Sequence, residues 1–116
     1  MIGRHLLADL YQVAPERLDD PELLGQCLEA AARECRLTPV APPVLHRFSG
    51  GGITGFLLLA ESHIAFHSYP EHGYLAIDIF SCGAADPATA LAVCEALLAP
   101  GEVQVTTAPR GEALRR

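Results

Sequence analysis

The segment from Ile53 to Ser81 constrains the fold more than any other part of this sequence. Over most of its length, apolar residues alternate with polar or small ones. Because successive side chains of a β-strand point to opposite faces of a sheet, this alternation predicts strands with one buried face. Turn residues divide the segment, so strands are expected over residues 53–61, 62–69 and 73–81.

One helix is expected before this segment and one after it. Each begins at an Asp-Pro pair, Asp20-Pro21 and Asp86-Pro87. Aspartate is a favourable helix N-cap, and proline suits the first turn, where its missing N–H would have no partner. Apolar residues then recur at the helical period, which gives each helix one buried face. These residues are Leu23, Leu24, Cys27, Leu28, Ala31, Ala32 and Cys35 in the first helix, and Ala90, Leu91, Val93, Cys94, Leu97 and Leu98 in the second.

With further strands expected at residues 3–13, 44–48 and 103–107, the element order is β-α-β-β-β-β-α-β. This order predicts a two-layer α/β sandwich, in which a largely antiparallel sheet carries two helices on one face. A chain of 116 residues suffices for a single core, so we expect one domain over residues 1–116. No helix is left to cover the opposite face of the sheet, and a homodimer that packs sheet against sheet would cover it.

The composition disfavours several classes of protein. The formal net charge is −6, and the eight basic residues form no stripe with interleaved aromatic residues, which disfavours nucleic-acid binding. The longest apolar run, Phe56 to Ala60, is too short to cross a membrane, and the N-terminal apolar run is too short for a signal peptide. The four cysteines form no Cys-x-x-Cys pair, which favours reduced thiols in a cytoplasmic protein over disulfides or a zinc site.

The triplet Glu61-Ser62-His63 places polar residues where a buried strand would otherwise continue. A serine hydrolase would need a base, such as His67, on the hydroxyl of Ser62. The Gly-x-Ser-x-Gly turn of the commonest hydrolases is absent, and Ser62 taken alone is typical of a strand-end hydroxyl bonded to backbone. Cys82 taken alone is likewise typical of a small buried apolar residue.

A metal site is a further possibility for the histidines. His63 and His67 stand four residues apart, so in a strand they share one face. A metal ion would need more ligands, for which His46, His72 and Asp78 are available. No recurrent ligand motif is present, and we expect no metal.

The order of these motifs along the chain is more specific than any one of them. Glu61-Ser62-His63 is followed by His67, and the order and spacing of the motifs run without a gap from Phe48 to Gly83. The other motif residues are Pro70-Glu71-His72-Gly73-Tyr74, Asp78 and Phe80-Ser81-Cys82-Gly83, preceded by Gly3-Arg4-His5-Leu6, His46-Arg47-Phe48 and Gly55. From residue 3 to residue 107, the chain resembles the S-adenosylmethionine decarboxylase proenzymes of the short bacterial and archaeal type.

This resemblance implies an enzyme that cuts its own chain to make a covalent pyruvoyl cofactor. The hydroxyl of Ser62 would attack the carbonyl of Glu61 to give an ester. Elimination of the ester would leave dehydroalanine, whose hydrolysis gives the pyruvoyl group. The resemblance assigns removal of the α-proton to His67. The products would be a β fragment, residues 1–61, and a pyruvoyl-capped α fragment, residues 62–116.

Position 54 departs from the family pattern. The relatives carry a serine there, eight residues before the processing serine, and it assists the rearrangement of the backbone. Thr54 keeps the hydroxyl but adds a methyl group that restricts its rotamers, so we expect a processing role with slower cleavage.

The resemblance also implies the reaction. The pyruvoyl group would form a Schiff base with the amine of S-adenosylmethionine and accept electrons as CO2 leaves. The product, S-adenosylmethioninamine, serves spermidine biosynthesis. Cys82 matches the acid that protonates the product, Phe48 an aromatic ring that stacks on adenine, and Glu71 a carboxylate that accepts hydrogen bonds from the ribose. The family further implies a homodimer of cleaved protomers with the active site near the subunit interface.

Two other functions stay open on the sequence alone. A pyruvoyl-dependent decarboxylase of the same family could act on arginine or ornithine, since its cleavage residues would be the same. Phe48 and Glu71 favour the nucleoside substrate over these basic amino acids. An unprocessed homologue could instead regulate an active partner, although the intact cleavage residues disfavour this role.

Overall fold

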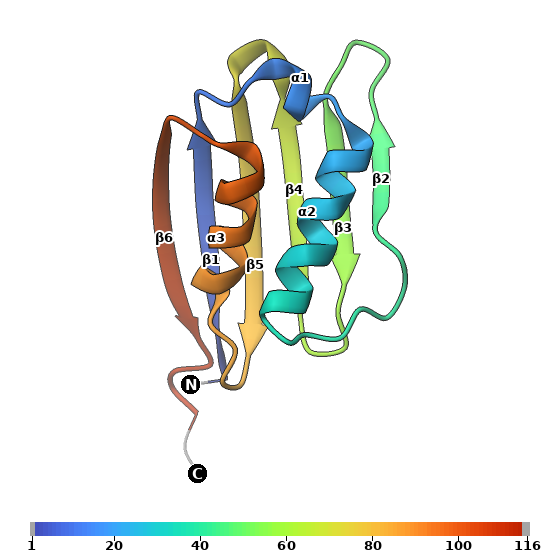
Figure 1. Ribbon diagram of the computed structural model, residues 1–116. Helices are drawn as coiled ribbons and strands as arrows, with labels where there is room; N and C mark the ends of the chain where they lie inside the picture. Colours follow the sequence, from blue (N-terminus) through green and yellow to red (C-terminus); the bar gives the residue numbers. More distant parts are fainter. Residues whose placement is uncertain (1, 115–116) are drawn as a thin grey trace.

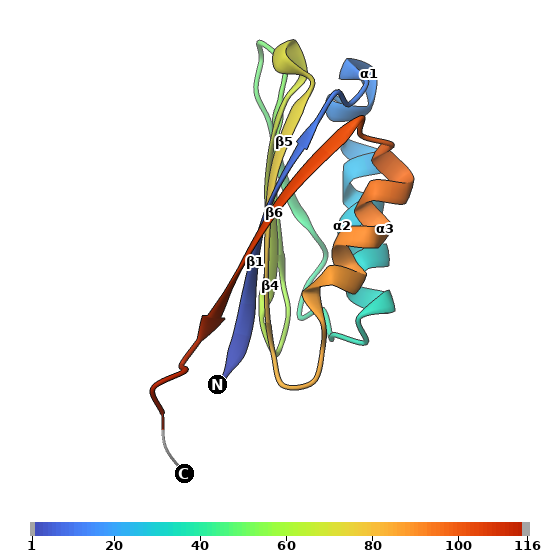
Figure 2. The ribbon, with the colours of Figure 1, turned by 90° about the vertical axis from the view of Figure 1, so that its left-hand side faces the viewer.

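The computed structural model describes residues 2–114 as two layers, a six-stranded sheet and a layer of helices (Figures 1 and 2). The elements are β1 (Gly3–Tyr11), α1 (Pro15–Leu18), α2 (Pro21–Glu34), β2 (Val44–Arg47), β3 (Ile53–Leu58), β4 (His63–Tyr69), the 3-10 turn η1 (Pro70–His72), β5 (Tyr74–Cys82), α3 (Pro87–Leu98) and β6 (Glu102–Arg110). The strand order is β2-β3-β4-β5-β1-β6, and all neighbouring strands pair antiparallel. The predicted α/β sandwich is confirmed.

Both long helices begin where the Asp-Pro pairs predict. The side chain of Asp20 accepts hydrogen bonds from the backbone N–H groups of Glu22 and Leu23, and that of Asp86 accepts one from Ala88. α2 packs against β3, and α3 packs against β1 and β5. Seen edge-on, the two helices lie on the same side of the sheet (Figure 2). The caps therefore fix the starts of two helices that cover one face.

This covered face holds the hydrophobic core. Its largest fully buried strand residues are Leu10, Ile53, Leu57, Ile64, Leu75 and Ile79, and the helices contribute Leu18, Leu24, Leu28 and Leu98. Burying one such side chain contributes about 1.5–3 kcal/mol, so the covered face supplies most of the hydrophobic stabilisation.

The four cysteines are free thiols. Cys27 of α2 and Cys94 of α3 are buried where the two helices meet. The hydrogen bond with Cys27, together with burial, raises the pKa of Cys94 well above its ordinary value. That thiol therefore stays protonated at neutral pH, as a small apolar core residue would.

The structure differs from the sequence-based prediction at several element ends. β1 ends at Tyr11 rather than at residue 13, because Gln12 has a φ of 59°, outside the range of a strand. β3 ends at Leu58 and β4 begins at His63, so the strands predicted to meet at residues 61 and 62 are separated by a turn. β6 is longer than the predicted 103–107, because it pairs with the whole of β1.

The helix layer contains α1 in addition to the two predicted helices, so the prediction of two helices was wrong by one. α1 is a single turn that starts at Pro15 and buries Leu18. Proline at the first helical position was its signal, but four residues are too few for a helical period to stand out.

The other face of the sheet is open, as predicted, with no helix of residues 2–114 packed on it (Figure 2). Leu7 of β1, and Phe56 and Leu58 of β3, are exposed on this open face. None of the helices within residues 2–114 combines the length and the apolar character that a membrane crossing needs.

Candidate active site

The bond between Glu61 and Ser62 lies in the tight turn between β3 and β4. The backbone N–H of Leu59 donates to the carbonyl of Ser62 at 3.0 Å, and the N–H of Ser62 donates back to the carbonyl of Leu59 at 3.3 Å. Ala60 and Glu61 therefore form the tip of the turn. The hydroxyl oxygen of Ser62 is buried, and within the described part of the chain it has no hydrogen-bond partner. A buried hydroxyl without a partner is unusual in a folded protein.

The carbonyl of Glu61 faces Cys82 at the end of β5. The thiol of Cys82 donates a hydrogen bond to this carbonyl oxygen, with the sulfur 2.7 Å from it. Cys82 lies opposite Gly3 in the sheet, where a Cβ would come within 2.4 Å of the carbonyl oxygen of Ser81. Only glycine allows the two strands to approach so closely beside this site. We call Glu61, Ser62 and Cys82 the serine cluster.

The side chain of Glu61 is held by Thr38, in the loop that follows α2. One carboxylate oxygen accepts the backbone N–H of Thr38 and the other accepts its hydroxyl, both at 3.0 Å. These bonds, the backbone one first, lower the pKa of Glu61 below its usual range. No motif of the sequence pointed to Thr38, because 23 residues separate it from Glu61.

The other predicted site residues gather near the opposite end of β4. Thr54 of β3 and His67 of β4 pair directly, and the hydroxyl oxygen of Thr54 lies 3.0 Å from Nδ1 of His67. A cavity of about 250 Å³ opens beside them, and Phe48 and Glu71 are among its lining residues. Phe48 is 51% exposed, so a flat group has room to stack on its ring. We call Thr54, His67, Phe48 and Glu71 the histidine cluster.

Asp19 fixes the loop that carries Phe48. Its carboxylate accepts hydrogen bonds from Nη2 of Arg47 at 2.8 Å and from the backbone N–H of Gly52 at 3.2 Å. The Arg47 side chain lowers the pKa of Asp19, with the Gly52 N–H adding to the effect. The backbone N–H of Phe48 also donates to the carbonyl of Gly52 at 2.9 Å, which closes the turn. The position of Phe48 therefore depends on a residue that the motifs did not single out.

Within one chain the serine and histidine clusters are far apart. Ser62 and His67 are five residues apart along an extended segment, and a strand rises about 3.3 Å per residue, so about 16 Å separates their Cα atoms. This distance excludes a direct proton transfer between them. The structure thus brings Ser62 together with Cys82, and His67 together with Thr54, but does not bring Ser62 to the His67 of the same chain.

A third group of polar side chains lies on the open face between the two clusters. Nε2 of His5 and Nε2 of His63 each lie 2.9 Å from the same carboxylate oxygen of Asp78, and Nη1 of Arg110 lies 3.2 Å from Nδ1 of His5. Since a carboxylate only accepts, both Nε2 atoms donate to it.

The residues that the sequence offered as metal ligands therefore differ from those that the structure brings together. Asp78 joins His63 with His5, whereas His67 bonds to Thr54 and His46 packs edge-on against Phe48. His5 was missed as a neighbour of Asp78, because only the pairing of β1 with β5 brings them together.

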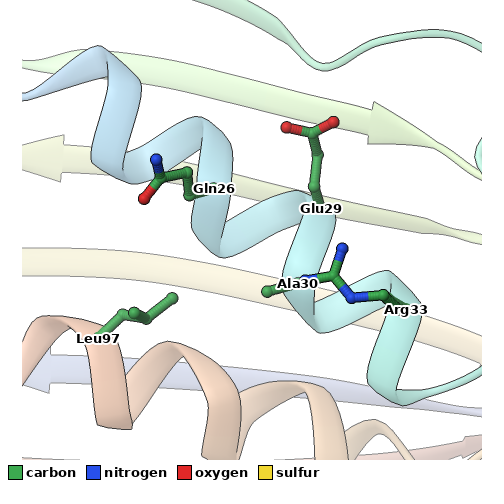
Figure 3. A pocket seen from close by; sticks show the side chains of 5 residues that line it. All are labelled: Gln26, Glu29, Ala30, Arg33 and Leu97. Atoms are coloured by element: carbon green, nitrogen blue, oxygen red, sulfur yellow. The ribbon is translucent and has the colours of Figure 1, made fainter.

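A larger hollow, of about 340 Å³, lies on the helix layer between α2 and α3 (Figure 3). It is lined by Gln26, Glu29, Ala30, Arg33 and Leu97. The helices separate it from the open face, so it takes no part in the candidate site.

Comparison with models of protein families matches residues 4–111 to the family described as S-adenosylmethionine decarboxylase. This chain belongs to that family. The match includes the serine cluster and the histidine cluster, and the resemblance predicted from the motifs is confirmed.

Individual members of the S-adenosylmethionine decarboxylase family are similar over much of the chain. A protein of Symbiobacterium thermophilum named S-adenosylmethionine decarboxylase proenzyme is 43% identical over 97 residues, which cover 83% of this chain and 73% of that one. A protein of the same name from Thermotoga petrophila is 38% identical over 95% of this chain and 85% of its own length. With the relative from Parasynechococcus marenigrum, 43% identical, the match spans 72% of this chain but only 64% of that protein.

The fold is also that of the family. The crystal structure of the adenosylmethionine decarboxylase from Aquifex aeolicus superposes with a TM-score of 0.89 and 32% sequence identity. The similarity covers 99% of this chain and 95% of that one.

Proposed function

We propose that this chain is a self-processing decarboxylase of S-adenosylmethionine that uses a pyruvoyl group made from Ser62. It would release CO2 and S-adenosylmethioninamine, for spermidine biosynthesis. The observation that carries the proposal is the serine cluster. There the buried, unpaired hydroxyl of Ser62 follows a carbonyl that Cys82 already holds by a hydrogen bond, in a chain of this family.

The first step is an exchange of bonds at the Glu61–Ser62 peptide. The hydroxyl oxygen of Ser62 bonds to the carbonyl carbon of Glu61, the bond from that carbon to the nitrogen of Ser62 breaks, and the hydroxyl proton passes to this nitrogen. The hydroxyl fits this role because no group within residues 2–114 holds it by a hydrogen bond. The Cys82 thiol, which donates to the same carbonyl, stabilises negative charge on its oxygen during the attack.

A base then removes the α-proton of residue 62. The bond from Cβ of that residue to the ester oxygen breaks, and the main-chain carboxylate of Glu61 leaves. Water replaces the amine, ammonia departs, and the chain ends as fragments 1–61 and 62–116. We assign the base to His67, whose Nδ1 is held by Thr54. The hydrogen bond to Thr54 orients the ring, which supports the processing role expected for that residue.

Once formed, the pyruvoyl group supplies an electron sink for the departing carboxyl group of the substrate. The protein's own side chains bind and protonate. Phe48, half-exposed at the cavity of the histidine cluster, would stack on adenine, and Glu71 in the same cavity would accept ribose hydroxyls. Cys82, which bonds to the carbonyl of Glu61 just before residue 62, would return a proton to the product.

The separation of the two clusters supports a homodimer. Two copies packed face to face and related by a twofold axis would lay the serine cluster of one protomer near the histidine cluster of the other. Each active site would then contain Ser62 and Cys82 from one chain and the partner's His67. The exposed apolar residues Leu7, Phe56 and Leu58 on the open face support burial of that face.

The cleavage test is direct. Electrophoresis of the purified chain should give two fragments, of 61 and 55 (116 − 61) residues, and mass spectrometry should find a pyruvoyl group at the start of the second. Intact chain after long incubation would favour the regulatory alternative. The relatives reported above are named for S-adenosylmethionine, and CO2 released from arginine or ornithine instead would overturn the proposed substrate.

Mixed dimers test the shared active site. Ser62→Ala cannot form the pyruvoyl group, and His67→Ala lacks the proposed base, so each variant alone should stay uncut. When differently tagged chains are refolded together, the His67→Ala chain should be cut, because its Ser62 meets the intact His67 of its partner. Absence of that cut, with mixed dimers present by gel filtration, would contradict the arrangement.

A further inference from the structure

We infer that Thr38 is a positioning residue for chain cleavage and has no part in decarboxylation. This inference rests on the proposed self-processing of the Glu61–Ser62 bond. Thr38 lies in the loop between α2 and β2, outside the cavity of the histidine cluster. Its only proposed task is to hold the upstream side of the bond that breaks.

Backbone hydrogen bonds connect the loop around Thr38 to the segment that leads from β3 into the turn before Ser62. The carbonyl of Thr38 accepts the backbone N–H of Ala60 at 2.8 Å, and the N–H of Val40 donates to the carbonyl of Leu58 at 3.0 Å. Between these bonds, Pro39 forms an isolated β-bridge with Leu59. Three consecutive residues of the loop thus run alongside the last residues before the cleavage site. This arrangement gives Thr38 a fixed place from which to act on Glu61.

Thr38 holds Glu61 at both carboxylate oxygens. Its backbone N–H binds one oxygen and its hydroxyl binds the other, each at 3.0 Å. A long side chain on a turn would ordinarily sample several rotamers, and two charge-assisted bonds to one residue restrict it to a single geometry. The lowered pKa of Glu61 agrees with a carboxylate that stays ionised and bound. The backbone of Glu61 is consequently held in place both through its own side chain and through the neighbouring Ala60, which also bonds to Thr38.

The restricted backbone matters because the reaction occurs at the carbonyl of Glu61. The oxygen of that carbonyl accepts a hydrogen bond from the Cys82 thiol, whose sulfur lies 2.7 Å away. The carbon of the same carbonyl is the atom that the Ser62 hydroxyl must reach. A turn residue free to rotate would move the carbonyl away from both groups for part of the time. Holding it in place raises the fraction of molecules in the reactive geometry. Thr38 touches none of the reacting atoms, so it acts through Glu61.

Loss of the Thr38 hydroxyl should affect the rates of cleavage and of turnover differently, whereas loss of a general structural residue would change both together. After cleavage, Glu61 is the end of the β fragment and makes no proposed contact with the substrate. Loss of the Thr38 hydroxyl should therefore slow the cut but leave the turnover of each cut chain unchanged. A residue needed only for folding would instead lower both rates together with the melting temperature.

The experiment compares Thr38→Val, Thr38→Ser and the matched control Thr107→Ala. Thr107 is an exposed threonine of β6, on the far edge of the sheet from β3. Valine keeps the shape of threonine without its hydroxyl, whereas serine keeps the hydroxyl. Full-length chains made by cell-free translation are followed by electrophoresis, and turnover is measured per mole of pyruvoyl group.

Thr38→Val should be cut about 5-fold more slowly, as expected for the loss of one exposed, charge-assisted hydrogen bond. Thr38→Ser and Thr107→Ala should be cut at the wild-type rate, and all cut chains should turn over equally. Cutting of Thr38→Val at the wild-type rate would overturn the inference, and so would equal losses of cleavage and turnover. If the wild-type chain itself stays whole, the proposed function fails, and this role fails with it.

Discussion

Alternate residues of β4 face two different environments, and this contrast explains how so small a chain combines stability with chemistry. Ile64, Phe66 and Ser68 point toward the helices and are buried. His63 and His67, on the same strand, lie on the open face. One strand therefore supplies the core on one side and reactive groups on the other, because its side chains alternate.

The two faces also differ in how their polar groups are satisfied. On the covered face the hydroxyl of Ser68 donates to the carbonyl of Leu18 at 2.7 Å and accepts the backbone N–H of Ile53 at 2.8 Å. On the open face His5 and His63 share the carboxylate of Asp78. Substitutions on the covered face should thus cause the large changes in the free energy of unfolding, whereas those on the open face should mainly change cleavage, turnover or assembly.

The largest expected effect on the open face is that of His67→Ala. Removal of a general base slows a proton transfer by about 100- to 10,000-fold. When every chain carries His67→Ala, the protein should therefore accumulate as uncut chain. Its free energy of unfolding should fall by less than about 1 kcal/mol, because the side chain and its hydrogen bond to Thr54 are exposed. Electrophoresis and urea denaturation measure the two quantities. His72→Ala, an exposed histidine of η1, is the control and should be cut normally. Normal cutting of His67→Ala would end the assignment of the base.

Phe66→Ala, at the residue before His67, should lower the stability of the fold instead. The Phe66 ring lies over Gly55 of β3, where a Cβ would come within 2.3 Å of it, and the residue is only 2% exposed. Its loss should lower the free energy of unfolding by about 3–5 kcal/mol, measured by urea denaturation. Val105→Ala, at a 49% exposed residue of the edge strand β6, should cost less than about 1 kcal/mol. Equal losses at the two positions would show that burial between the sheet and the helices is not what stabilises the fold.

Phe56→Asp tests whether the open face is an interface. A charge at this 40% exposed position of β3 should weaken the proposed dimer by at least about 30-fold, the loss typical of a central interface residue. Sedimentation at micromolar concentration should then detect monomers, with cleavage lost as well. Val105→Asp places the same charge at a similarly exposed residue that pairs with buried Ala8 and so faces the helix side, and it should remain dimeric. A monomeric wild type would refute the dimer directly.

Much of this fold was predictable from local patterns. The Asp-Pro pairs located the starts of α2 and α3, because an N-cap and a first-turn proline act within a few residues. Alternation located the strands of the sheet. Their ends were less accurate, since Gln12 leaves the strand region through a positive φ that glutamine rarely adopts.

The candidate site was predictable only as a set of residues. Motif order indicated Ser62, Cys82 and His67 as candidates, and strand geometry alone implies that Ser62 and His67 are about 16 Å apart. The partners of these residues depend on contacts between distant segments. Thr38 reaches Glu61 through the path of a loop, and His5 reaches Asp78 through the pairing of β1 with β5. Neither contact has a local sequence signal.

The smallest change in the free energy of unfolding is expected from substitution of a tyrosine on the open face. Tyr74 stacks between Tyr11 and Tyr69, and its hydroxyl donates a hydrogen bond to Asp9. This bond, followed by burial, raises the pKa of Tyr74 to about 12.

The phenol must keep its proton to donate, so its contribution to stability is complete below the ordinary value of about 10 and is lost as pH rises through about 12. Tyr74→Phe should lower the free energy of unfolding at pH 8 by at most about 1 kcal/mol, and the difference from wild type should vanish toward pH 12. In a spectrophotometric titration Tyr74→Phe should remove a phenol that ionises near pH 12. If the phenol that it removes ionises near the ordinary value of about 10 instead, the hydrogen bond to Asp9 does not hold in solution, and the open face is less ordered than the covered one.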